Sequence, residues 1–229
     1  MNYFSEQDIR DVVSRVLSSA STTVPVKVRE DALGKIIPVE ISARHVHLTK
    51  EAVEILFGKG YELTPKRELS QPGQYLCVER VKLVTAKGQL DNVAILGPVR
   101  GENQVELSLT DARILGVEAP IRLSGDLDGA ADVLIVSNLG VVTAEKSVIV
   151  AKAHIHMTPT DAKNYNVSDG EHVDIRMGTE RPVTLNDVVV RVREDYTLAA
   201  HIDFDEANAA QVRGSNITGH LSKRRWSNE

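Results

Sequence analysis

The stretch EISARHVHLT, residues 40–49, has a second copy, IVAKAHIHMT, at residues 149–158. Each copy has the pattern of a β-strand that ends in His-x-His and is followed by a threonine suited to cap a helix. Residues i and i+2 of a strand point to the same face, so each histidine pair projects together and the residue between points into the core. The repetition predicts a duplicated strand-then-helix unit.

A second pair of similar stretches follows later in each half. VELSLTDA, residues 105–112, matches AHIDFDEA, residues 200–207, and both are typical of a strand, a cap and a helix. In this match Glu106 takes the place of His201. The third residue lies 59 positions after the second histidine in the first half and 45 in the second, so we expect a loop-sized insertion of 14 residues in the first half.

From Ile36 onward, short β-rich stretches such as IIPVEIS and NVAILGPV alternate with Gly, Pro, Asn and Asp. This pattern predicts a mainly β fold with short helices, built as small barrels or sandwiches. Before it, residues 5–20 place Ile9, Val12, Val13, Val16 and Leu17 on one face of an amphipathic helix. The predicted organisation is a helix and linker (1–35), two repeats (36–130 and 131–220) and a polar tail (221–229).

Composition narrows the function classes. The chain has 229 residues, 27 Lys plus Arg against 32 Asp plus Glu, and 42% hydrophobic residues, an ordinary globular profile. A net charge of −5 argues against nucleic acid as a partner. No apolar run reaches the roughly 18 residues needed to cross a bilayer, and the N-terminus lacks the pattern of a signal peptide, so we expect no membrane partner and a cytoplasmic location. The single cysteine, Cys77, is predicted to be a core residue.

Paired imidazoles at a strand end suit a divalent metal such as zinc, which needs one further protein ligand and an open position. The duplication supplies a candidate for that ligand in each half. The two predicted sites are His45, His47 and Glu106, and His154, His156 and His201. The alternative is that the histidines are solvated or structurally hydrogen-bonded and that Glu106 faces solvent.

Arg100 lies between two glycines in GPVRGEN, just before the strand that carries Glu106. A guanidinium there could bind a phosphate bidentately near the metals, or it could be a turn arginine paired with a surface carboxylate. Arg44 is interpreted as structural, LSGDLDG (residues 123–129) as an ordinary turn rather than an anion-binding nest, and His172 and His220 as surface residues.

Four motifs, SARHVHL, GPVRGENQVELS, AKAHIHMTP and AAHIDFDEAN, occur in this order over about residues 36–220. Together they resemble the PduL-type phosphotransacylases, also called phosphate propanoyltransferases. The resemblance implies a pair of short β-barrels with two zinc ions between them. It also implies the exchange of coenzyme A and phosphate on an acyl group, with the six residues above as zinc ligands and Arg100 in contact with phosphate.

Family members in bacterial microcompartments carry an N-terminal encapsulation peptide, which residues 5–20 resemble. The resemblance therefore implies shell or cargo proteins as partners, and it leaves a homo-oligomer open. Two alternatives come from other classes. His45, His47, Glu51 and Gly58 mimic the first motif of cupins, which are single-metal enzymes, although Glu51 is expected in a helix rather than a strand. The other alternative is a non-catalytic microcompartment protein stabilised by zinc.

Overall fold

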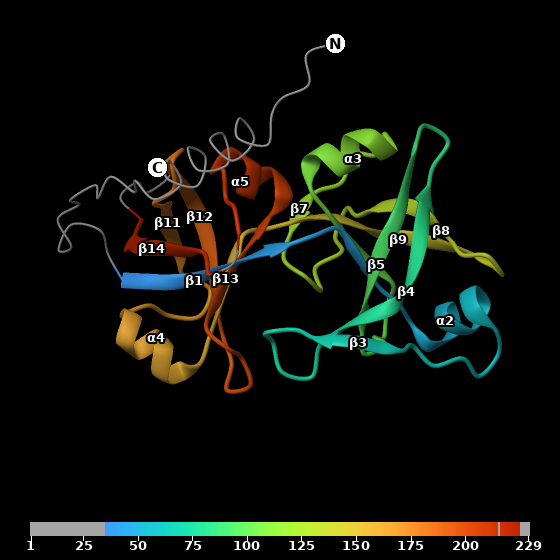
Figure 1. Cartoon of the computed structure of the whole chain (residues 1–229), viewed down its shortest axis with the longest axis horizontal. Coiled ribbons are helices and arrows are strands. Elements are labelled where there is room, and N and C mark those ends of the chain that lie inside the picture. The colour runs from blue at the N-terminus through green and yellow to red at the C-terminus, as the bar shows by residue number, and fades with distance from the viewer. Residues whose placement is uncertain (1–34, 215, 225–229) are drawn as a thin grey trace, which may run out of the picture. The chain divides into compact units, whose positions relative to one another are not determined.

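The computed structural model describes residues 35–214 and 216–224. The predicted amphipathic helix over residues 5–20 and the linker that follows it up to residue 34 lie outside the described residues. Within the described residues the fold is mainly β with four short helices, and its strands form two closed barrels (Figure 1), which confirms the predicted fold class.

Six strands close the first barrel, in the order β4-β5-β2-β6-β9-β8 and back to β4. Their bounds are β2 (His45–His47), β4 (Tyr75–Val84), β5 (Gln89–Gly97), β6 (Gln104–Leu107), β8 (Ala131–Val136) and β9 (Val141–Ala151). Two short strands extend this sheet: β3 (Pro65–Glu68) pairs with β4, and β7 (Ile121–Arg122) pairs with β9.

Six strands also close the second barrel, in the order β1-β13-β10-β12-β11-β14. Their bounds are β1 (Lys35–Ser42), β10 (His154–Met157), β11 (His172–Met177), β12 (Val183–Val192), β13 (Ala199–Asp203) and β14 (Thr218–Lys223). The predicted polar tail from residue 221 therefore begins inside a strand, and His220, predicted to be a surface residue, is half-buried in that strand.

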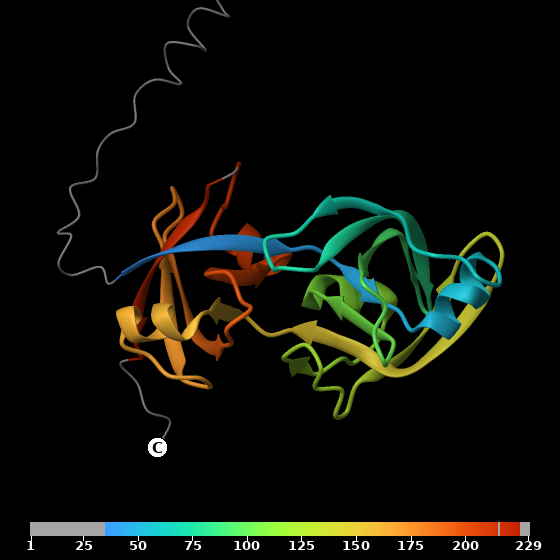
Figure 2. The same cartoon turned by 90° about the horizontal axis from the view of Figure 1, so that it is seen from below.

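The two barrels do not coincide with the predicted repeats, which divide near residue 130. Strand β1 starts the described chain but belongs to the second barrel, whereas β8 and β9 lie beyond residue 130 and complete the first. The chain consequently passes between the barrels twice, at Ala43–Arg44 and at Lys152–Ala153, along the blue and yellow segments of Figure 2. Each His-x-His pair begins directly after one of these crossings.

The strand pairing is duplicated, as the sequence repeat predicts. In the first barrel β2 is parallel to β5 and antiparallel to β6; in the second, β10 is parallel to β12 and antiparallel to β13. The antiparallel registers place His45 opposite Glu106 and His154 opposite His201. The structure thus confirms that Glu106 and His201 hold equivalent positions.

Each half has one helix after the His-x-His strand and one after the strand of the third residue: α2 (Lys50–Phe57), α3 (Leu109–Leu115), α4 (Pro159–Tyr165) and α5 (Phe204–Ala209). The predicted caps start them. The Thr49 side chain accepts from the backbone of α2, and Thr158 forms a capping box with Asp161 while Pro159 occupies the first turn of α4. Each cap lies two residues after the second histidine of its pair.

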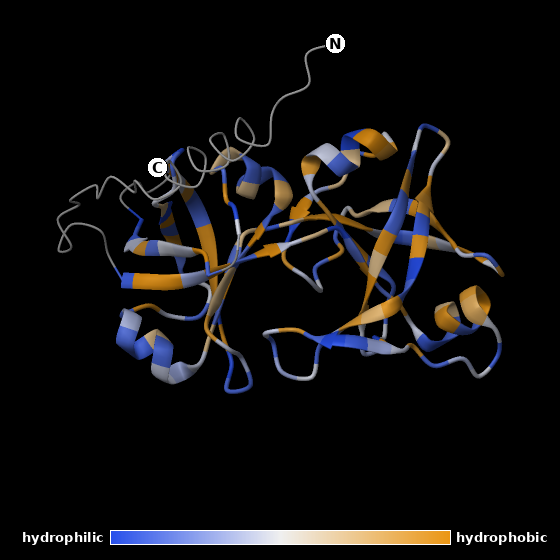
Figure 3. Ribbon diagram, in the orientation of Figure 1, coloured by the Kyte–Doolittle hydropathy of each residue, from blue (hydrophilic) through white to orange (hydrophobic). Residues whose placement is uncertain are grey.

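Each barrel has its own hydrophobic core, visible as apolar segments on the strands of Figure 3. Val46 and Ile155, the residues between the paired histidines, are fully buried in the first and second core. Full burial of such a side chain contributes about 1.5–3 kcal/mol, so the alternation that buries them holds the histidines on the opposite face. Cys77 is buried in the first core, as predicted. Among the described residues no helix has the length and apolar character needed to span a membrane.

Candidate functional site

The structure brings the six predicted residues together into two groups, one at each barrel. Within each group the candidate ligand atoms all lie within 4.8 Å of one another. We call the groups the first cluster and the second cluster. The first cluster is His45, His47 and Glu106; the second cluster is His154, His156 and His201.

The geometry of each cluster follows from two strand rules. The alternation of side chains places both histidines of a pair on one face, and the antiparallel register places the third residue beside the first histidine. The rings of His45 and His47 lie 5.0 Å apart, and those of His154 and His201 lie 5.1 Å apart. The clusters therefore need no residue from a flexible loop.

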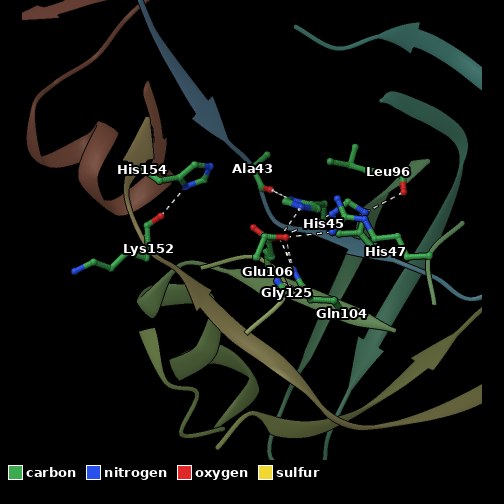
Figure 4. A network of polar contacts seen from close by, with 11 residues as sticks. Ala43, His45, His47, Leu96, Gln104, Glu106, Gly125, Lys152 and His154 are labelled. Atoms are coloured by element: carbon green, nitrogen blue, oxygen red, sulfur yellow. Dashed lines mark hydrogen bonds and ion pairs between the residues drawn. The ribbon is translucent and has the colours of Figure 1, made fainter. Parts of the chain in front are cut away.

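In the first cluster a buried carboxylate faces two imidazoles (Figure 4). Glu106 Oε1 lies 3.7 Å from His45 Nε2 and 3.8 Å from His47 Nε2, and all three side chains are buried. Burial alone would raise the pKa of Glu106, but attraction to His45 and His47 together with hydrogen bonding outweighs it and holds the pKa well below its usual range. Burial would lower the pKa of His45, but attraction to Glu106 together with hydrogen bonds to Glu106 and the Ala43 carbonyl raises it. Burial and the neighbouring His45 lower the pKa of His47 to about 3.

The second cluster has no carboxylate, and its three rings are all held neutral. Burial lowers the pKa of His154, and burial with the charge of neighbouring histidines lowers the pKa of His156 to about 2 and that of His201 to about 3. Neutral imidazole is the form that binds a metal. Two ring nitrogens of this cluster, His156 Nδ1 and His201 Nε2, are buried with no hydrogen-bond partner within the described residues.

Backbone carbonyls fix the orientation of three rings. His45 Nδ1 lies 2.7 Å from the Ala43 carbonyl and His154 Nδ1 lies 2.8 Å from the Lys152 carbonyl, so the two barrel crossings hold equivalent rings in the same way (Figure 4). His47 Nδ1 lies 3.2 Å from the Leu96 carbonyl. A proton on Nδ1 donates to each carbonyl and leaves Nε2 as a metal-ligating atom.

These observations fit two divalent ions. Unpartnered buried nitrogens are rare in proteins because a buried polar atom without a partner is costly, and a metal ion would satisfy those of the second cluster. Two histidines with a glutamate, and three histidines, are both donor sets of catalytic zinc sites. Glu51, the ligand that a cupin-like site would require, lies exposed in α2 and belongs to neither cluster.

A hydrogen-bond network connects the first cluster to Arg100. Gln104 Nε2 donates to Glu106 Oε1 at 2.6 Å and to Ser124 Oγ at 2.9 Å, and Arg100 Nη1 donates to the same hydroxyl at 3.1 Å. The backbone N–H of Gly125 donates to Gln104 Oε1 at 2.9 Å. Gly125 lies in a turn and has a positive φ, which favours glycine. The segment LSGDLDG is thus a turn, as predicted, but its serine also holds the guanidinium of Arg100.

Both clusters and Arg100 line one cleft of about 750 Å³ between the barrels. This volume is within the range of small-molecule sites. Six arginines line the cleft, against three acidic residues, so it suits an anionic ligand. The arginines are Arg44, Arg67, Arg80, Arg100, Arg191 and Arg193.

Several residues of the site escape sequence reasoning. Gln104 shares a strand face with Glu106 by simple alternation, which is a usable signal, but nothing local links it to Ser124. The ring of Tyr196 packs 4.1 Å from that of His156, from a loop that the sequence leaves unassigned. Arg44 is structural, as predicted, because it pairs with Asp111 at 2.9 Å, although it also reaches the cleft. His172 is exposed and paired with Asp187.

The fold and site define a class of protein: a duplicated double barrel with two candidate metal centres that face one arginine-rich cleft. Comparison with known proteins gives the family. The model of the phosphate propanoyltransferase family matches residues 38–213.

Several curated relatives carry the same description. The phosphate propanoyltransferase of Alkaliphilus metalliredigens is 48% identical over 220 residues, which cover 95% of this chain and 99% of the relative. That of Leptotrichia buccalis is 52% identical over 81% of this chain and 87% of its own length, and that of Clostridioides difficile is 48% identical over 92% and 100%. The chain therefore belongs to the phosphate propanoyltransferase family, a family of phosphate acyltransferase enzymes.

Proposed function

We propose that this enzyme exchanges coenzyme A and phosphate on a short-chain acyl group, so that acyl-CoA and phosphate are interconverted with acyl phosphate and CoA. The observation that carries the proposal is the pair of His/Glu clusters in one arginine-rich cleft. Membership of the phosphate propanoyltransferase family supports the reaction class.

In this proposal each cluster holds one zinc ion or a similar divalent ion, the first through two histidines and Glu106 and the second through three histidines. Zinc supplies Lewis acidity, which lowers the pKa of a thiol and stabilises negative charge that develops on an oxygen atom. The protein supplies rings with a fixed tautomer, because the carbonyls of Ala43, Lys152 and Leu96 hold Nδ1.

Arg100 binds the phosphate in this proposal. A guanidinium forms two parallel hydrogen bonds to a phosphate, which fixes the direction of the remaining oxygens. One of these oxygens attacks the carbonyl carbon of the thioester; the new C–O bond forms, the C–S bond breaks, and its electron pair leaves on the sulfur of CoA. Ser124 and Gln104 tie the guanidinium to Glu106, so the phosphate would be held at a fixed position relative to the first cluster.

The proposed transfer is direct and needs no acyl-enzyme on cysteine. Cys77 is fully buried in the core of the first barrel, and burial raises the pKa of its thiol to about 11. The thiolate is the nucleophilic form, so this residue is unsuited to attack a thioester.

The test is an assay of CoA release by the full-length protein purified without chelator. We expect release to depend on both acyl-CoA and phosphate, and acyl phosphate to form in equal amount, with a panel of acyl chain lengths giving the preference. Cys77→Ala should retain this activity. A protein that contains two metal ions per chain but releases no CoA from any acyl-CoA would contradict the proposal and favour the non-catalytic, zinc-stabilised alternative.

We further propose that the enzyme works within a bacterial microcompartment in the cytoplasm, and that residues 5–20 bind shell or cargo proteins there. An isolated helix of about 15 residues is marginal in water, so the apolar stripe predicted for this segment needs a partner. Deleting residues 1–20 should leave CoA release and metal content nearly unchanged and abolish co-localisation with a shell. A large loss of activity with unchanged co-localisation would contradict this role.

A further inference from the structure

The two halves differ at the strand neighbour of the third cluster residue. In the second barrel β1 runs parallel to β13, and Glu40 lies beside His201. In the first barrel β9 runs parallel to β6 in the same way, and Ile149 lies beside Glu106. Glu40 and Ile149 are also the first residues of the duplicated stretches. The strand neighbour of His201 is thus a carboxylate, whereas the strand neighbour of Glu106 is a buried apolar residue.

The Glu40 carboxylate faces one specific atom of His201. Its Oε2 lies 3.7 Å from His201 Nδ1, while His201 Nε2 is buried and has no hydrogen-bond partner within the described residues. Nδ1 of three other cluster rings faces a backbone carbonyl at 2.7 to 3.2 Å. At His201 the group that faces Nδ1 is a carboxylate at an ion-pair distance rather than a hydrogen-bonded carbonyl.

A residue of the first barrel holds Glu40 in this position. Ser70 Oγ donates to Glu40 Oε2 at 2.6 Å, which matters because the Glu40 side chain is 42% exposed and would otherwise be free to turn into solvent. Ser70 lies in the connection between α2 and β4, which runs over residues 58–74, whereas the equivalent connection between α4 and β11 covers only residues 166–171. Most of the insertion predicted from the sequence is therefore this connection.

The same connection is anchored on the second barrel next to Ser70. Gln71, which is 5% exposed, donates from Nε2 to the Thr197 carbonyl at 3.0 Å and accepts from the Thr197 N–H at 3.2 Å. Thr197 directly follows Tyr196, whose ring packs on His156. Two adjacent residues of the first barrel thus reach the surroundings of two rings in the second cluster.

We propose that Glu40 is a positioning residue for His201, held in place across the barrel interface by Ser70. From 3.7 Å the carboxylate favours a proton on Nδ1 of His201, which leaves Nε2 to bind a metal ion and makes the ring a stronger donor to it. Beside the carboxylate of Glu106 a second negative charge would be repulsive, which accounts for Ile149 at the matching position. The metal-binding part of this inference rests on the proposed function.

The first experiment measures metal affinity in the full-length protein loaded with zinc, by competition with a chromogenic chelator. Loss of a side chain that orients a metal-binding histidine typically costs 10- to 100-fold in metal affinity. We expect Glu40→Ala to lower the affinity for one of the two zinc ions by this factor and to leave the affinity for the other unchanged. Ser70→Ala should act in the same direction with a smaller effect, Ser70→Thr should restore wild-type binding, and Glu118→Ala, at an exposed glutamate, is the matched control.

The second experiment determines which ring nitrogen of His201 carries the proton. It uses long-range ¹H–¹⁵N correlation spectra of the histidine side chains, in which the His201 signals are assigned by substitution. We expect His201 protonated on Nδ1 in the wild type and a changed tautomer or a faster exchange of that proton in Glu40→Ala. Wild-type zinc affinity in Glu40→Ala, or His201 protonated on Nε2 in the wild type, would overturn the inference. Absence of bound metal in the wild-type protein would contradict the proposed function, and the tautomer would still decide the role of Glu40.

Discussion

The first and second clusters occupy the same position in two duplicated barrels, yet their electrostatics differ. In the first, Glu106 stays ionised and raises the pKa of His45; in the second, His201 replaces the carboxylate and the pKa of every ring is lowered. A divalent ion in the first cluster would carry a net charge of about +1, and one in the second about +2. A single residue per barrel would therefore give two metal sites of different charge on one backbone arrangement.

The comparison predicts that each cluster binds its own ion. His45→Ala and His154→Ala should each reduce the metal content from about two ions per chain to about one and lower the rate of CoA release on the order of 10³-fold, as loss of an electrostatic stabiliser does. Elemental analysis and the kinetic assay measure both effects. His172→Gln, at an exposed histidine, should change neither. Loss of both ions from either variant would mean that the clusters form a single coupled site.

The position of Arg100 is specific to the first cluster, through Ser124 and Gln104. Arg100→Lys keeps the charge but removes the planar pair of donors, so we expect a loss of about 2–4 kcal/mol of transition-state stabilisation with the metal content unchanged. The dependence of the rate on phosphate concentration measures this loss, and Arg113→Lys on α3 is the control. If the rate of Arg100→Lys depended on phosphate concentration as in the wild type, Arg100 would be a structural turn residue and not a phosphate ligand.

Much of this comparison can be read from the sequence because it depends on local rules. Strand alternation puts His45 with His47 and buries Val46, and the internal repeat aligns Glu106 with His201 before any register is known. The caps at Thr49 and Thr158 are equally local, because each satisfies backbone groups within three residues.

The exchange of strands between the barrels has no local signal. Strand β1 pairs with β13, about 160 residues away, and nothing in its own residues distinguishes that partner from the neighbouring β2. For the same reason the contacts of Ser70 with Glu40 and of Ser124 with Arg100 are not predictable, since each joins segments that only the tertiary fold brings together.

The neutral rings of the second cluster predict that acid destabilises the metal-free protein. In the metal-free protein the folded-state pKa of His201 is about 3, below the ordinary value of 6.5, so between these values the unfolded chain binds more protons. The free energy of unfolding should therefore fall as the pH drops from about 6.5 towards 3, by about 1.4 kcal/mol per pH unit for each such histidine. Chemical denaturation at several pH values measures this slope. His201→Gln should reduce it.

The smallest expected effect concerns the equivalent acidic residues in α3 and α5. Asp111 and Glu206 are the third residues of these helices, and Asp111 pairs with Arg44. In the second repeat Ala153 stands at the position of Arg44, so Glu206 has no arginine there to pair with. Burial raises the pKa of Glu206 to about 7, above the ordinary value of 4.5.

A carboxyl group with a raised pKa contributes stability that is complete below pH 4.5 and is lost as the pH rises through about 7, because the folded state binds the additional proton. Glu206→Gln keeps an oxygen that can accept from the Asp203 N–H, so it should stabilise the protein by about 1–2 kcal/mol at pH 8 and by much less at pH 5. Asp111→Asn, which weakens the pairing with Arg44, should instead destabilise at both pH values. Denaturation curves of the two variants at pH 5 and pH 8 measure the change in the free energy of unfolding. Equal changes in the two variants would show that the absence of an arginine beside Glu206 does not distinguish α5 from α3.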